Sequence, residues 1–163
     1  MTRIFPRIPV DIWYVVFAFI VLGLSFIFVP RKNYRSLFYE GMIFGTLFSW
    51  VIISLLTALK LFHYRIYGPF GFMNNPIWLN LAWAPAIIIF LYFKPPMRSL
   101  LPFWGYLLSF SFLSAAIDRV LHNMGLLEYL HWSPAYRFVF SLLWFFAISY
   151  LHEKVLPRWE WQD

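Results

Sequence analysis

The sequence predicts an all-α, polytopic membrane protein built as a bundle of five transmembrane helices. Of its 163 residues, 62% are hydrophobic and only 12% are charged, whereas about 25% of the residues in a soluble domain are charged. The apolar residues gather into five long stretches, a pattern typical of membrane-spanning helices. No polar stretch is long enough for a soluble domain, so we expect a single transmembrane domain over residues 1–163.

Helix-breaking and helix-capping residues mark the ends of the predicted spans. Pro30 ends the first span, and Pro85 lies inside the third. Gly125 is a C-cap candidate after the fourth span, and Ser133-Pro134 forms an N-cap and first-turn pair before the fifth. The five spans are predicted at residues 10–29, 37–62, 77–93, 100–122 and 134–152.

The positive charges predict an orientation. One side of the membrane receives seven cations: Arg31, Lys32, Arg35, Lys94, Arg98, Lys154 and Arg158. The other side receives six: Arg3, Arg7, Lys60, Arg65, Arg119 and Arg137. Lys60 and Arg119 lie within helix ends rather than in loops, which leaves seven against four. The positive-inside rule then predicts a multi-pass protein of the cell membrane, with the N-terminus outside and the C-terminus in the cytoplasm.

Polar residues gather at the predicted outer end of the bundle. Asp118 and His122 are spaced i, i+4 and share a helix face, whereas the adjacent Arg119 cannot share a face with Asp118. We interpret the group as a polar cap that fixes the fourth span, with a polar ligand or ion site, or a catalytic metal site, as alternatives. The neighbouring candidates are Glu128, His131, His63 and Arg65.

Small residues at helical spacing predict close helix packing. Gly41, Gly45 and Ser49 form a small-xxx-small row on the second span. Such rows let two helix backbones approach each other closely. We interpret the row as a packing face within the bundle, with a homodimer face as the alternative.

An interior proline and several tryptophans are candidates for lining a cavity. Pro85 frees a backbone carbonyl near residue 81, beside the polar Asn80. We interpret these residues as part of a well-packed aromatic core, with a polar cavity for a planar or lipidic ligand, lined by this carbonyl, as the alternative. The tryptophans considered with this cavity are Trp83 on the same span and, as its walls, Trp78, Trp104 and Trp144.

Four stretches carry a family resemblance. They are the basic and aromatic residues 31–39, Gly45-Thr-Leu-Phe-Ser-Trp50, Asn74-Asn75 with Ala84-Pro85, and Asp118 followed by Gly-x-x-x-Tyr-x-x-Trp over residues 125–132. In these stretches the chain resembles an uncharacterised family of small five-span membrane proteins from spore-forming bacteria. Its members tend to have glutamate in place of Asp118 and Gly-Asp in place of Gly45-Thr46. The resemblance implies the five-span fold and no particular activity.

Familiar catalytic motifs are missing from the sequence. It contains no G-x-S-x-G elbow, P-loop or dinucleotide fingerprint, and no cysteine. We therefore expect a non-enzymatic accessory subunit or a binder of a lipophilic or small polar ligand, without a cofactor. The expected partners are the lipid bilayer and a homo-oligomer or larger membrane complex, and not nucleic acid. The alternatives are a small ion or solute transporter component, and a membrane enzyme that acts on lipid through His and carboxylate groups.

Overall fold

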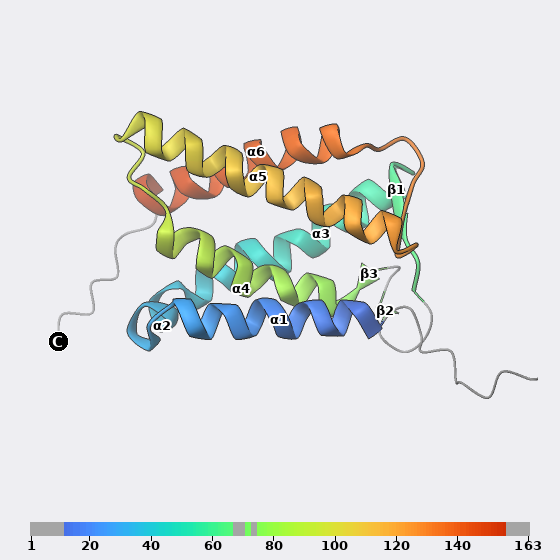
Figure 1. Ribbon diagram of the computed structural model, residues 1–163, viewed down its shortest axis with the longest axis horizontal. Coiled ribbons are helices and arrows are strands. Elements are labelled where there is room, and N and C mark those ends of the chain that lie inside the picture. The colour runs from blue at the N-terminus through green and yellow to red at the C-terminus, as the bar shows by residue number, and fades with distance from the viewer. Residues whose placement is uncertain (1–11, 67–70, 73–74, 156–163) are drawn as a thin grey trace, which may run out of the picture.

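The computed structural model describes residues 12–66, 71–72 and 75–155, and these form an all-α fold of five helical segments (Figure 1). Two of these segments pass without a break from α-helix into a π-helical stretch. The segments are α1 (Ile12–Phe28), α2 (Arg31–Glu40) with η1 (Gly41–Leu47) and α3 (Phe48–Ala58), α4 (Ile77–Phe93), α5 (Leu100–Asn123), and α6 (Pro134–Tyr150) with η2 (Leu151–Val155).

Three of the described helices are long and apolar enough to cross a membrane. They are Arg31–Ala58, Leu100–Asn123 and Pro134–Lys154. The apolar helices α1 and α4 are shorter, with 17 residues each. Each of the five predicted spans is mostly helical in the structure. Residues 10 and 11 of the first span lie outside the described residues.

The second helix differs most from its predicted range. It begins at Arg31, in the stretch expected to be a link, because Pro30 precedes a polar run that is compatible with a helix. It ends at Ala58 instead of residue 62 because Lys60 adopts a left-handed conformation, with φ of 56°. The Leu61 N–H then bonds to the Leu56 carbonyl at 3.1 Å, which closes the helix end.

Short strands, which the sequence did not predict, organise the loops at one end of the bundle, on the right in Figure 1. They are β1 (Phe62–Tyr64), β2 (Gly71–Phe72), β3 (Asn75–Pro76) and β4 (Leu127–Tyr129). β1 pairs antiparallel with β4, and β2 with β3. The Tyr14 hydroxyl donates to the Leu126 carbonyl at 2.7 Å, which ties α1 to these loops.

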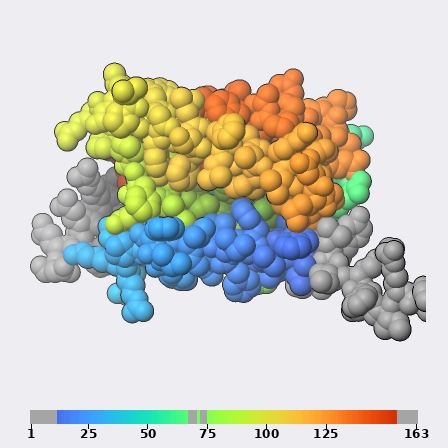
Figure 2. Space-filling view, in the orientation of Figure 1, coloured from blue at the N-terminus to red at the C-terminus, as the bar shows by residue number. Residues whose placement is uncertain are grey.

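Helix α4 is the centre of the fold. It is apolar on all sides and buries nine of its residues, as expected for a helix that other helices surround. It packs against α1, α2 and η1, whereas α5 packs mainly against α6. Figure 2 agrees with this burial, since most of green α4 is covered and much of what is visible lies between blue α1 and gold α5. Phe90 joins the two layers by contacting Phe145, with 4.6 Å between the ring centroids.

Helix α4 and η1 approach each other through glycine. A Cβ atom added to Gly45 lies 2.5 Å from the Trp83 carbonyl oxygen and 2.6 Å from the Ala84 Cα. One added to Gly41 lies 2.6 Å from Ile88 Cγ1. The small-residue row therefore faces α4 inside the bundle.

We predict that Gly45→Ala destabilises the protein by about 2 kcal/mol, because the new methyl group overpacks against the α4 backbone. Gly23→Ala is the matched control, since a Cβ there has no neighbouring atom within 4 Å. The control should be neutral or stabilising by up to about 1 kcal/mol, because alanine favours helix. Thermal unfolding in detergent measures both variants, and equal stability of the two contradicts the close approach.

Candidate functional site

A buried ion pair joins α5 to α6. The Nε atom of Arg137 lies 3.7 Å from Oδ1 of Asp118, and the two residues are only 8% and 3% exposed. The indole N–H of Trp132 donates to Asp118 Oδ2 at 3.3 Å, and Nε of Arg137 donates to Ser114 Oγ at 3.1 Å. The carboxylate and the guanidinium are therefore each held by a second group.

Local sequence signals set this geometry. Gly125 has a φ of +74° and ends α5, as its predicted C-cap role requires. Ser133 caps α6 by accepting a hydrogen bond from the Tyr136 N–H at 3.3 Å, and Pro134 takes the first turn. Arg137 then lies one turn into α6. The antiparallel helix α5 places Asp118 at a similar distance from the same end of the bundle.

The network continues from the ion pair towards the middle of the bundle. Ser141 donates to Ser114 at 3.0 Å, one turn further along α6. The guanidinium carbon of Arg137 lies 5.1 Å from the centroid of the Trp83 ring on α4, a cation-π contact. Arg137 thus connects the α5–α6 layer to the central helix.

A recess adjoins this network. It holds about 420 Å³ of empty space, counting the part that is open to the outside. Four polar side chains line it: Ser49, Ser114, Arg137 and Ser141. Its lining residues Ile52 on α3 and Phe140 and Trp144 on α6 are only partly buried. A water molecule fits in the recess as it stands, and a larger group requires its lining side chains to move.

Hydrogen-bond donors remain unused around the recess. Nε of Arg137 bonds to Ser114, but the two terminal guanidinium nitrogens make no hydrogen bond to any described residue. Ser49 donates to Asn80 Oδ1 at 3.2 Å, while the buried Asn80 Nδ2 has no partner among the described residues. The buried Asn80 Nδ2 costs about 1–3 kcal/mol unless it finds an acceptor. The terminal nitrogens of Arg137 are not fully buried, so acceptor atoms in the recess can reach them.

The other candidates at this end are spread over its surface. Arg119 is exposed and forms no ion pair with any described residue. His122 contacts the Leu127 carbonyl at 3.0 Å through Nδ1 and stacks on Tyr129, with ring centroids 4.1 Å apart. Within the described residues, no group of three or more His, Cys, Asp or Glu side chains could hold a metal ion.

The loop candidates form two surface contacts. The guanidinium of Arg65 pairs with Glu128 at 3.0 Å, and both side chains are exposed. His63 lies opposite Glu128 in the β1–β4 ladder and is exposed. Nδ1 of His131 contacts the Lys60 carbonyl at 3.2 Å. These contacts connect the loops rather than forming a pocket with Asp118.

Tyr64 in β1 and Tyr129 in β4 stay neutral at physiological pH. Burial raises the pKa of Tyr129 to about 12, and the negative charge of Asp118 adds to the effect. Burial also raises the pKa of Tyr64 well above its ordinary value. Both phenols therefore remain protonated.

The predicted cavity residues fall into three places. Trp83 and Trp144 line the recess, and Asn80 bonds to its lining residue Ser49. Pro85 lines a separate apolar groove on another side of α4. Trp104 is exposed and stacks on Phe146, with 5.8 Å between the ring centroids.

Four members of the network were absent from the predicted site: Arg137, Ser114, Ser141 and Trp132. The predicted cap of α6 was a usable signal, because it places Arg137 one turn from the end of the bundle where Asp118 also lies. The three others become recognisable only once the two helices are in register.

Comparison of the chain with protein-family models, with curated proteins and with solved structures finds no match. The resemblance to the family of five-span membrane proteins stays a prediction.

We predict that Arg137→Gln lowers the free energy of unfolding by about 3 kcal/mol or more, because it leaves the buried Asp118 carboxylate without its partner. Arg119→Gln, the matched change at an exposed position, should alter it by no more than about 0.5 kcal/mol. Denaturant or thermal unfolding in detergent compares the two variants. A larger loss for Arg119→Gln contradicts the assignment of the ion pair.

Proposed function

We propose that the chain is a five-span protein of the cell membrane, with its N-terminus outside, and that its recess binds an amphipathic ligand. The ligand has a polar group rich in oxygen acceptors and an apolar body. Support for five spans comes from α1 and α4, whose 17 apolar residues rise about 26 Å and nearly match a hydrocarbon core of about 30 Å.

The proposal rests on the Arg137 side chain and its hydrogen-bond donors. It is 8% exposed, and it lines the recess. A guanidinium has five N–H donors, of which only the one on Nε bonds to a described residue. The four donors on its terminal nitrogens are suited to a planar carboxylate, a phosphate or a carbonyl group.

The place of the ion pair in its helices supports a role in binding. Arg137 lies near the N-terminus of α6, and Asp118 lies towards the C-terminus of α5. Asp118 lies more than one turn before the end of α5, beyond the reach of the helix dipole, whereas Arg137 lies in the first turn of α6. A ligand acceptor that meets Arg137 therefore also lies near a helix N-terminus, where the dipole favours negative charge.

The surroundings of the recess indicate how the ligand enters. Ile52, Phe140 and Trp144 line the recess and are apolar and only partly buried, and we place its opening beside them. In a five-span bundle this opening faces lipid. The ligand then enters sideways from the bilayer with its polar group towards Arg137, and its apolar body stays in contact with the border residues.

The test is binding of tetradecanoate, measured by native mass spectrometry of the protein in mild detergent, with tetradecanol as the acceptor-poor comparison. Wild-type protein should prefer tetradecanoate. Arg137→Lys should weaken tetradecanoate binding at least tenfold, because lysine keeps the charge beside Asp118 but loses the planar set of donors. Arg119→Lys is the matched control and should bind like the wild type.

A second variant tests the opening without touching the ion pair. Ile52→Trp places a larger ring at the border of the recess and should reduce binding of both probes. Ile43→Trp makes the same change at an exposed position of η1 and should not. Equal binding of tetradecanoate and tetradecanol to the wild type, or unchanged binding by Arg137→Lys, contradicts the proposal.

A further inference from the structure

An apolar groove crosses the side of the bundle formed by α1, α2, η1 and α4. It holds about 640 Å³ of empty space, counting the part that is open to the outside. Both α1 and the α2–η1 helix pack on α4. The groove residues on α4 run from Trp78 to Ile88, which corresponds to a rise of about 15 Å.

The groove is suited in shape and polarity to a hydrocarbon chain. Its small lining residues Ala18 and Ala84 leave space between the helices, and nearly all of its lining surface is apolar. Phe26 on α1 and Tyr34 on α2 stack across the pair of helices, with ring centroids 4.9 Å apart. This stack marks the end of the groove nearest to the start of α2.

Positive charge lies at that same end. Arg31 and Arg35 are exposed on α2, and each is one helical turn from a groove residue, Tyr34 or Phe38. Being spaced i, i+4, the two arginines are neighbours on one helix face. Two neighbouring guanidinium groups are suited to a phosphate, which each of them can bind through two N–H donors.

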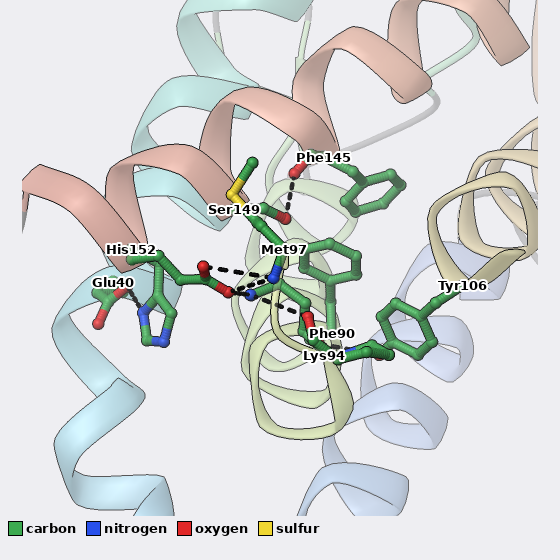
Figure 3. Close-up of polar contacts among 10 residues, drawn as sticks. Glu40, Phe90, Lys94, Met97, Tyr106, Phe145, Ser149 and His152 are labelled. Carbon is green, nitrogen blue, oxygen red and sulfur yellow. Dashed lines mark hydrogen bonds and ion pairs between the residues drawn. The ribbon is translucent and has the colours of Figure 1, made fainter. Parts of the chain in front are cut away.

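The described carboxylates at this end are already engaged. Glu40 lies 2.7 Å from Nδ1 of His152 (Figure 3). Glu153 pairs with Lys94 and also accepts the Met97 backbone N–H at 3.0 Å. These contacts join η2 to α2 and to the link between α4 and α5. They leave the two arginines of α2 without a carboxylate partner among the described residues.

We propose that this groove and these arginines form a binding site for an anionic phospholipid. One acyl chain lies in the groove against Ala18, Leu22 and Trp78, and the phosphate is held by Arg31 and Arg35. The site is distinct from the recess, which is lined by other residues, four of them polar. On the orientation given by the positive charges, the lipid comes from the cytoplasmic leaflet, where anionic headgroups attract juxtamembrane cations.

The test compares phosphatidylglycerol with phosphatidylcholine of the same acyl chains, titrated into the purified full chain and measured by native mass spectrometry. Wild-type protein should retain phosphatidylglycerol at least tenfold more tightly. The double variant Arg31→Gln, Arg35→Gln should lose that preference, whereas Arg98→Gln, which neutralises an exposed arginine in the link between α4 and α5, should keep it. Equal retention of the two lipids by the wild type overturns the proposal, as does an unchanged preference in the double variant.

The position of the acyl chain is tested separately. Phosphatidylglycerol with brominated chains quenches the fluorescence of nearby tryptophans. In vesicles that are otherwise phosphatidylcholine, it should quench the fluorescence of the wild type more than that of a Trp78→Phe variant. Ala18→Leu fills the groove and should abolish this difference, whereas Ala147→Leu on an exposed face of α6 should not. Identical quenching of the wild type and Trp78→Phe places the chain elsewhere and overturns the proposal, even if Ala18→Leu fails to fold.

Discussion

The contact between the Asp118 carboxylate and the Arg137 guanidinium fixes how α5 and α6 lie against each other. Taking two charges out of water costs several kcal/mol for each ion, so the helices are most stable when the two groups meet at the same depth. Ser114 and Trp132 then hold the pair from either side. The same constraint brings Arg137 over the Trp83 ring and so fixes the α5–α6 layer relative to α4.

The other layer depends on shape rather than on charge. Gly41 and Gly45 let η1 approach the α4 backbone closely, and α1 packs on another side of α4. Two hollows remain around the central helix. The one towards α6 is lined by polar groups of the ion-pair network, and the one between α1 and α2 is apolar with arginines at its end. Their different linings are the basis of the two proposed binding sites.

The sequence predicted local features of this fold better than contacts between helices. The cap at Ser133-Pro134 and the end of α5 at Gly125 follow from backbone chemistry that a few neighbouring residues determine. The partner of Asp118 could not be predicted in this way. Arg137 belongs to another helix, and only the register of α5 and α6 brings the two residues together. The strand pairing of β1 with β4 was missed for the same reason, since 62 residues or more separate the paired positions.

The most direct test of the account is the position of the two ends of the bundle relative to the membrane. The chain has no cysteine, so single cysteines at His63 and His131 at one end, and at Arg35 and Arg98 at the other, can be labelled individually. All four side chains are exposed. With a membrane-impermeant maleimide, we predict labelling at 63 and 131 in intact cells, and at 35 and 98 only after permeabilisation. Labelling of both ends from the same side contradicts the five-span arrangement.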